Sequence, residues 1–148
     1  IAGNIAVSTD KIDAKRLKEA ARMACIDDFI NSLPLGYDTI IGMEGKGISQ
    51  GQRQRILIAR AIYKNPDYIF LDEATNSLDA TNEAKIMSNL LEFYKGRTVV
   101  VSAHRLSTIL DADQIVVMRS GKVVECGTHD SLLEKHGKYY ELVKNQMT

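Results

Sequence analysis

Residues 68–73 read Tyr68-Ile69-Phe70-Leu71-Asp72-Glu73, and this stretch decides the fold. An apolar run followed at once by two acids is typical of a buried strand with carboxylates at its end. A second run, residues 98–103 (TVVVSA), is also apolar on both faces. Between them, residues 80–94 predict a helix whose apolar side is formed by Ile86, Leu90 and Leu91. The region therefore predicts a strand-helix-strand crossover in a mainly parallel sheet covered by helices.

Two helices are predicted upstream of the first strand. The first covers residues 13–33, with Asp13 as its cap and an apolar stripe at helical spacing formed by Leu17, Ala20, Ala21 and Ala24. Glycine density then predicts a loop over residues 37–47. The second helix covers residues 51–64 and is closed by Asn65-Pro66.

The C-terminal third predicts a hairpin followed by helix. Residues 114–118 and 122–125 form its strands, residues 119–121 form the turn, and helix begins at about Asp130. No internal repeat or long linker divides the chain, so its 148 residues predict a single core.

Composition narrows the function classes. Charged residues make up 26% and hydrophobic residues 45%, the values of an ordinary folded domain. Lys plus Arg and Asp plus Glu both number 19, so no overall field favours nucleic acid, and no nucleic-acid partner is expected. Cys25 and Cys126 lack the spacing of a disulfide scaffold, and Cys25 is expected in the core. With no run of about 18 apolar residues, the chain itself is expected to be soluble.

The start of the second helix carries a capping motif. Ser49, followed three residues later by Gln52, forms a capping box in which each side chain bonds a backbone amide. Taken alone, that role is structural. The functional alternative is a phosphate site made by the Ser49 hydroxyl, the Gly51 amide and the positive end of the helix dipole.

Polar residues follow both predicted strands. Asp72 and Glu73 end the first strand, Asp79 follows them, and His104 ends the second. Ligands bind at the carboxyl edge of open α/β sheets, where these groups are expected to gather. In a nucleotide site Asp72 would hold Mg2+ and Glu73 would orient the attacking water. The alternatives are a solvated strand end for the acids and a structural role for His104.

Four segments, in this order, resemble the motifs of the ATP-binding cassette (ABC) domain of exporter-type transporters. They are residues 47–55 (GISQGQRQR) for the signature, 70–75 (FLDEAT) for Walker B, 77–79 (SLD) for the D-loop and 103–107 (AHRLS) for the switch-histidine loop. Residues 33–39 (LPLGYDT) and 127–133 (GTHDSLL) are similar to exporter cassettes as well, so the resemblance covers essentially the whole chain. Within exporters, residues 56–75 and 137–147 most resemble bacterial peptidase-containing bacteriocin and peptide exporters.

The resemblance implies an α/β fold. It is part of a P-loop NTPase (RecA-like) ABC ATPase core with a helical signature subdomain, and its Walker A strand is missing. Residues 1–66 would form the helical subdomain and signature helix. Residues 67–148 would form the C-terminal part of the core, making one truncated domain overall.

The resemblance also implies an ATP-hydrolysing portion of an exporter that uses ATP and Mg2+. Glu73 and His104 would be catalytic, His104 as the γ-phosphate contact, and Asp72 would lie beside the metal. The remaining nucleotide contacts would come from Ser49, Gly51, Gln52 and Asp79. In the family two cassettes face head to tail, so the implied partners are a second cassette and the exporter's transmembrane domain. The implied location is the cytoplasmic face of a bacterial inner membrane.

Two departures from the family pattern qualify these expectations. Gln50 stands at the third signature position, which is commonly Gly, so no phosphate contact is assigned to it. The larger departure is that the chain contains no G-x-x-x-x-G-K-[ST] loop, and residues 42–47 (GMEGKG) do not fit it. We therefore expect the chain to be a piece of a longer polypeptide that does not hydrolyse ATP efficiently alone. By analogy with the family, the missing strand would leave two unpaired apolar edges, which predicts self-association.

Other functions remain open on the sequence alone. Residues 1–66 could dock on a membrane domain without a catalytic role, although Glu73 argues against a purely structural cassette. A non-transport ABC-superfamily ATPase is a further alternative, against which residues 105–108 (RLST) favour an exporter. Cys126, His129 and His136 have metal-like spacing but lack a fourth ligand. A basic helix face could meet the opposite cassette or be solvated, and it comprises Arg53, Arg55, Arg60 and Lys64.

Overall fold

The computed structural model describes residues 1–7, 11–42, 47–72, 80–102 and 109–146. The chain forms two compact units, Ile1–Val101 and Ser102–Thr148. The expected division at residue 66 rests on family motifs and stays a prediction. In the described ranges, no helix combines the length and apolar character needed to cross a membrane.

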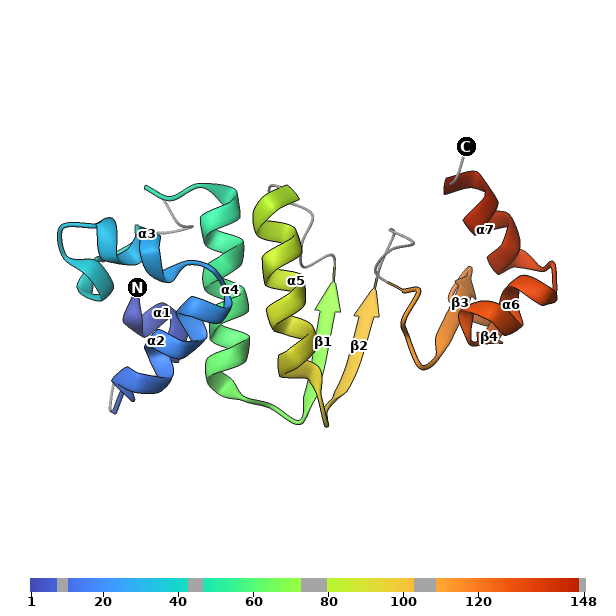
Figure 1. Ribbon diagram of the computed structural model, residues 1–148, viewed down its shortest axis with the longest axis horizontal. Helices are drawn as coiled ribbons and strands as arrows, with labels where there is room; N and C mark the ends of the chain where they lie inside the picture. The colour runs from blue at the N-terminus through green and yellow to red at the C-terminus, as the bar shows by residue number, and fades with distance from the viewer. Residues whose placement is uncertain (8–10, 43–46, 73–79, 103–108, 147–148) are drawn as a thin grey trace. The chain divides into compact units, whose positions relative to one another are not determined.

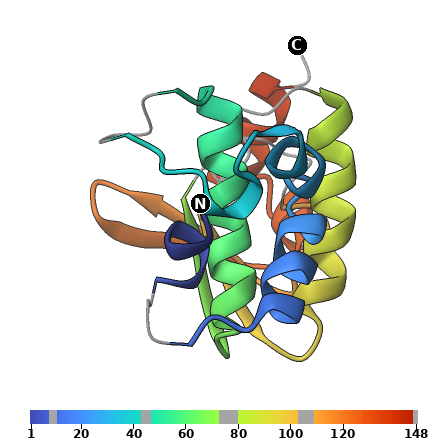
Figure 2. The ribbon, with the colours of Figure 1, turned by 90° about the vertical axis from the view of Figure 1, so that its left-hand side faces the viewer.

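The first unit contains a helical part and a strand-helix-strand part (Figure 1). The helical part comprises α1 (Ala2–Ala6), α2 (Ala14–Met23), α3 (Asp27–Ser32), the 3-10 helix η1 (Gly36–Asp38) and α4 (Gln50–Lys64). Figure 2 shows α2 and α4 side by side, and the two helices are in contact. Their common core includes Ile5, Ile26 and Ile30, each 0% exposed.

The first predicted helix starts as expected but ends early. Asp13 Oδ1 accepts hydrogen bonds from the amides of Lys15 at 3.0 Å and Arg16 at 3.1 Å, which confirms the cap. The predicted apolar stripe is buried as well, from Leu17 to Ala24. The single helix over residues 13–33 is wrong, because the chain turns at Cys25, whose φ of 52° is left-handed, before α3 begins. The break lets Ile26 and α3 pack back onto the core.

The second predicted helix is confirmed as α4. It begins one residue earlier than expected, after the cap residue Ser49, and ends at Asn65, whose left-handed φ of 52° precedes Pro66. Its buried residues Ile58, Ala59 and Ile62 face the core.

The crossover is confirmed as β1 (Tyr68–Asp72), α5 (Ala80–Tyr94) and β2 (Thr98–Ser102). The two strands are neighbours in one sheet and point the same way in Figure 1. Burial on both strand faces is wrong for the described residues: Ile69 is 5% exposed, but Phe70 is 76% exposed and Val100 50%. Within α5, Ile86 and Leu90 are buried as expected, whereas Leu91 is 55% exposed, because it lies about 100° further round the helix than Leu90.

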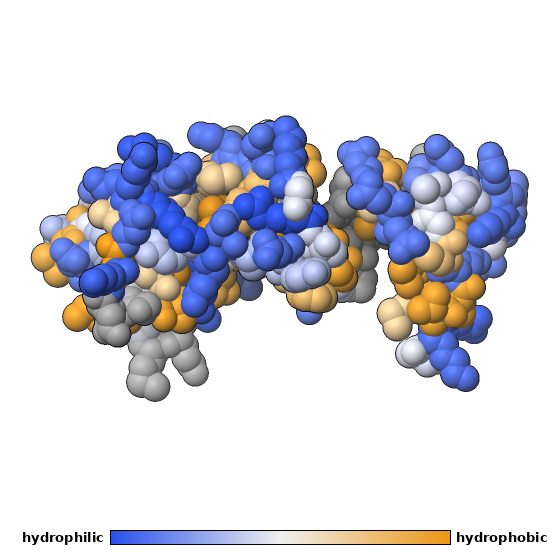
Figure 3. Space-filling view, turned by 90° about the horizontal axis from the view of Figure 1, so that it is seen from below, coloured by the Kyte–Doolittle hydropathy of each residue, from blue (hydrophilic) through white to orange (hydrophobic). Residues whose placement is uncertain are grey.

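The second unit contains the predicted hairpin and two helices. Strands β3 (Ile115–Arg119) and β4 (Lys122–Gly127) pair antiparallel around Ser120 and Gly121, whose φ values of 50° and 74° suit a two-residue hairpin turn. Helices α6 (His129–Glu134) and α7 (Lys138–Gln146) follow. The hairpin packs on these helices through a small core formed by Ile115, Val117, Leu132, Tyr139 and Val143. Figure 3 shows apolar side chains at the surface of both units.

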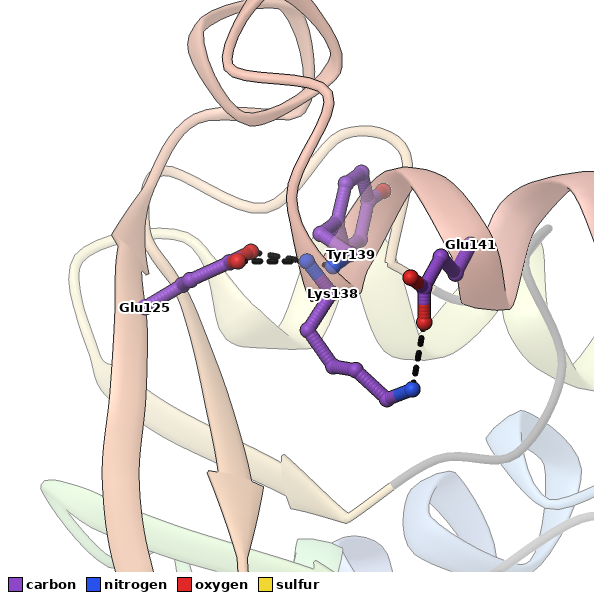
Figure 4. A network of polar contacts seen from close by, with 4 residues as sticks. All are labelled: Glu125, Lys138, Tyr139 and Glu141. Atoms are coloured by element: carbon purple, nitrogen blue, oxygen red, sulfur yellow. Dashed lines mark hydrogen bonds and ion pairs between the residues drawn. The ribbon is translucent and has the colours of Figure 1, made fainter.

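Helix α7 is capped from a distance by a residue of β4. Glu125 accepts a hydrogen bond from the Tyr139 amide at 2.9 Å through Oε2, and another from the Lys138 amide through Oε1 (Figure 4). These amides hold the pKa of Glu125 below its ordinary value. The carboxylate thus joins the hairpin to the start of α7.

Candidate functional site

The predicted capping box is present at the start of α4. Ser49 Oγ accepts a hydrogen bond from the Gln52 amide at 3.1 Å, and Gln52 Oε1 accepts one from the Ser49 amide at 2.8 Å. The Ser49 carbonyl accepts the amide of Arg53 at 2.9 Å, the first bond of the helix ladder. Three of the predicted site residues, Ser49, Gly51 and Gln52, therefore lie in one turn of backbone.

This turn has donors left for an anion. The first amides of a helix have no partner inside the helix, and here the capping box uses only that of Gln52. Among the described residues, no acceptor is bonded to the amides of Gln50 or Gly51. Ser49 is exposed and Gly51 is half-buried, so a ligand can approach both. The start of α4 thus fits a phosphate group.

Asp72 is the last residue of β1 and is exposed. In Figure 1 the first turn of α4 and the carboxyl ends of β1 and β2 face the same end of the first unit. Carboxylate oxygens are the ligands that Mg2+ prefers, and Asp72 is therefore suited to the metal role expected of it. Glu73, Asp79 and His104 lie outside the described residues, and their predicted roles stay predictions.

Arg55 supports the capped turn from within the chain. Its guanidinium donates to the Cys25 carbonyl at 2.8 Å through Nη1 and to the Gly51 carbonyl at 3.4 Å through Nε. Arg60 in turn donates to the Asn4 carbonyl at 2.7 Å. The basic face expected on α4 is therefore divided: two of its arginines hold backbone inside the chain, while Arg53 and Lys64 are exposed.

Asn89 of α5 reaches the same region. Its side-chain amide donates to the Met23 carbonyl at 2.8 Å and to the Cys25 sulfur at 3.8 Å. Burial raises the pKa of the Cys25 thiol, and nearby Lys85 and Arg55 reduce that rise. Sequence reasoning did not single out Asn89 and placed Arg55 on a solvent or partner face. Their acceptors are backbone carbonyls, which leave no pattern in a sequence.

Two hollows of the described surface are lined by residues outside this turn. One, of about 340 Å3, is lined by α2 residues from Lys15 to Met23. The other, of about 360 Å3, lies where α1 meets residues 37–41. No metal-binding cluster of three or more His, Cys, Asp or Glu side chains occurs among the described residues, which include Cys126, His129 and His136. The alternative metal site at these three residues is therefore unsupported.

Comparison with known proteins gives the family. The model of the ABC transporter family matches residues 3–76, which is half of the chain. An ATP-dependent lipid A-core flippase of Saccharophagus degradans is 50% identical over 148 residues, which are 100% of this chain and 25% of that protein. A Salmonella typhimurium flippase of the same name is 50% identical over 99% of this chain and 25% of its own length. The ABC multidrug transporter MDR5 of Trichophyton rubrum is 49% identical over 92% of this chain and 11% of its own.

A solved structure agrees with these matches. A bacterial Atm1-family ABC exporter with ATP bound superposes with a TM-score of 0.91 at 41% identity, over 99% of this chain and 26% of that one. This chain therefore spans about a quarter of the length of the bacterial exporters it resembles. The α/β fold is that of a partial P-loop NTPase, as expected from the motifs. The chain belongs to the ABC transporter family, and it corresponds to part of the nucleotide-binding domain of an ABC exporter.

Proposed function

We propose that this chain supplies the signature side of an ATP site in an exporter that couples ATP hydrolysis to transport. The observation that carries the proposal is the capped first turn of α4, where the family's signature residues stand and where the amides of Gln50 and Gly51 have no acceptor among the described residues. The exposed carboxylate of Asp72 supports it, because it ends a strand on the same side of the first unit. Family membership supplies the link to ATP and Mg2+.

Each residue of the proposed site has a definite task. Ser49 presents its hydroxyl, Gly51 its backbone amide and Gln52 its side-chain NH2 group to the phosphates of an ATP held by an opposing cassette. Asp72 holds Mg2+ through its oxygens. Bound Mg2+ would neutralise charge on the phosphates during hydrolysis.

The remaining tasks fall on residues outside the described ranges. Glu73 orients the attacking water, His104 contacts the γ-phosphate, and Asp79 contributes from the D-loop. The partners proposed are a second cassette in head-to-tail arrangement and a transmembrane domain, with the cassette at the cytoplasmic face of the membrane. The helical part, residues 1–66, and the core part, residues 67–148, belong to one truncated ATPase domain.

The chain alone is proposed to be a poor ATPase. Its sequence has no glycine loop with a lysine to hold the β- and γ-phosphates. Hydrogen bonds to charged groups contribute about 1.5 to 3 kcal/mol each, so loss of several of them leaves nucleotide affinity low. The 148 residues supply the signature-side contacts of a composite ATP site, and the glycine-loop contacts must come from another segment.

The substrate is a separate question. The relatives carry different substrate descriptions, a lipid A-core flippase and a multidrug transporter among them. The resemblance to peptide and bacteriocin exporters stays a prediction. Substrate is selected by the membrane domain of an exporter, so transport assays on the parent protein, with peptide and lipid substrates side by side, would decide it.

The experiment that tests the proposed function compares Mg-ATP hydrolysis by two proteins. One is the 148-residue chain, and the other is the chain joined at its N-terminus to a glycine-loop segment from a related exporter; we call the second protein the joined cassette. Hydrolysis by the joined cassette only, abolished by Glu73→Gln, supports the proposal. Hydrolysis by the bare chain that Glu73→Gln removes would show a phosphate-gripping element that the motifs do not reveal. Hydrolysis unaffected by Glu73→Gln would contradict the role of Glu73.

A further inference from the structure

The C-terminal end of α2 forms a turn in which two carbonyls accept hydrogen bonds from side chains of other helices. Cys25 is left-handed, the Ile26 amide bonds the Ala21 carbonyl at 2.9 Å, and the Cys25 amide bonds the Arg22 carbonyl at 2.9 Å. This pair of bonds is the Schellman pattern, usually built on glycine. The pattern leaves the carbonyls of Met23 and Cys25 as acceptors, and we call residues 23–25 the α2 corner.

Two side chains from different elements satisfy these carbonyls. Asn89 of α5 donates to the Met23 carbonyl, and Arg55 of α4 donates to the Cys25 carbonyl, both at 2.8 Å. Both donor side chains are half-buried. A guanidinium and an amide donor at the C-terminal end of a helix are placed favourably, because that end carries the negative end of the dipole. The α2 corner therefore joins α5 to α4.

The contacts continue to the signature turn. The Nε of Arg55 donates to the Gly51 carbonyl at 3.4 Å, so one guanidinium spans from the α2 corner to the first turn of α4. A chain of polar contacts thus runs from Asn89 through the corner and Arg55 to Gly51.

Asn89 also occupies a special place in the first unit. Among the described residues, the side chains of Asn89 and Arg97 both make hydrogen bonds across residue 66, between the helical part and the strand-helix-strand part. Arg97 donates to Asn65 Oδ1 at 2.6 Å, at the opposite end of α4 from the signature. One contact therefore fixes the C-terminal end of α4, and the other, acting through the corner, fixes its beginning.

We propose that Asn89 is a positioning residue for the signature turn. By holding the α2 corner against α5, it sets where Arg55 anchors Gly51, and hence where Ser49 and the first amides of α4 lie relative to the end of β1. Asn89 acts through Arg55 and does not touch nucleotide. The inference rests on the proposed function for its consequence in hydrolysis, but its structural content can be tested without nucleotide.

The structural test uses backbone amide hydrogen exchange on the 148-residue chain. Asn89→Leu keeps the approximate shape and removes the donor, and Asn89→Asp removes the donor and adds a charge. Asn145→Leu, at an exposed position of α7, is the matched control. Both Asn89 variants should speed exchange in the first two turns of α4 about fivefold, as loss of one hydrogen bond predicts, with the β3–β4 hairpin unchanged. Faster exchange at the α2 corner alone, with α4 unaffected, would overturn the proposal. Equal effects from Asn145→Leu would overturn it as well.

The functional test uses the joined cassette. Asn89→Leu should lower kcat/KM for Mg-ATP about tenfold, whereas Asn145→Leu should leave it unchanged; both are assayed well below their unfolding midpoints. Asn89→Gln, which keeps the donor, should recover part of the loss. Ser49→Ala and Glu73→Gln are measured beside them. If these two reduce hydrolysis and Asn89→Leu does not, the positioning role is wrong and the proposed function stands. If neither of the two reduces hydrolysis, the proposed function itself fails, and exchange alone decides the role of Asn89.

Discussion

The guanidinium of Arg97 donates to the side-chain oxygen of Asn65 at 2.6 Å and so ties the end of α4 to the start of β2. Arg97 also lies over the Phe93 ring, 4.2 Å from its centroid, and donates to the Phe93 carbonyl. Asn65 is the left-handed residue that ends α4. One side chain therefore contacts the C-terminal ends of both α4 and α5, just before the first residues of β1 and β2.

Arg97→Met should lower the free energy of unfolding by about 1 to 2 kcal/mol, because it removes the hydrogen bonds to Asn65 and Phe93, a longer one to the Lys95 carbonyl and a cation–π contact, while keeping the stem. Urea unfolding followed by circular dichroism measures the change. Lys95→Met is the control, since the Lys95 side chain is 72% exposed and forms an exposed ion pair with Glu92. An Arg97 variant as stable as the Lys95 variant would show that the link contributes nothing.

Ser49 can be tested for stability and function separately. Ser49→Ala removes the cap and should cost about 1 kcal/mol, whereas Ser49→Asp caps equally well and should leave stability near that of the parent. In the joined cassette both substitutions should lower hydrolysis, because a carboxylate repels phosphate. Thr128→Ala, which removes the matching capping box of α6, is the control: the same loss of stability with hydrolysis retained. Retained activity in Ser49→Asp would contradict the phosphate role.

The Glu125 cap predicts a pH dependence. Because the amides of Tyr139 and Lys138 hold the folded pKa of Glu125 below its ordinary value of 4.5, its contribution to stability is complete above pH 4.5 and is lost as pH falls through the folded value. Thermal unfolding between pH 7 and pH 3 should show this loss, and Glu125→Gln should flatten that part of the profile. An unchanged acid profile in the variant would assign the loss to other carboxylates.

Gly137, which has no side chain, leaves space for the Glu125 carboxylate at the start of α7. A Cβ at this position would overlap Glu125 Oε1, so Gly137→Ala must displace the carboxylate from the start of α7. The substitution should lower the thermal midpoint by a few degrees and should not add to Glu125→Gln in the double variant. Full additivity would show that the two residues act independently.

Exposed apolar strand residues predict that the 148-residue chain self-associates. Phe70 is 76% exposed and Met118 63%, and within the described residues each sheet has only two strands, so strand edges remain open. Phe70→Lys and Met118→Lys should each shift the chain toward the monomer in sedimentation velocity, whereas Lys122→Glu should not. A monomer before any substitution would refute this prediction.

Local rules predicted the elements whose cause is local. The Asp13 cap, the Ser49 box and the hairpin turn all follow from residues a few positions apart. The cap and the box are present as expected, and the turn expected at residues 119–121 comprises Ser120 and Gly121, because Arg119 still pairs with Lys122. The break at Cys25 was missed because a cysteine stands where the left-handed turn usually has glycine. The strands were expected to be covered on both faces, but among the described residues helices cover one, which an apolar run cannot reveal.

In the candidate site, too, the residues that belong to sequence motifs were predicted and the tertiary contacts were not. Ser49, Gly51, Gln52 and Asp72 stand in motifs, and the structure places the first three in one turn and the last at a strand end. Arg55 and Asn89 could not be assigned their contacts in advance, because their partners are main-chain atoms some 30 and 66 residues away. Only the tertiary arrangement brings donor and acceptor together.

Because the acceptors at the α2 corner are main-chain carbonyls, this region should tolerate replacement by the corresponding segment of another exporter. Every residue type carries a carbonyl, so substitutions at positions 23 and 25 leave the acceptors of the α2 corner in place as long as the turn keeps its shape. The demand on side-chain identity falls on the donors in α4 and α5. If α2 and its corner were replaced by the corresponding segment of a distant exporter, Arg55 and Asn89 of this chain would still bond its carbonyls, provided that the new helix ends in the same left-handed turn.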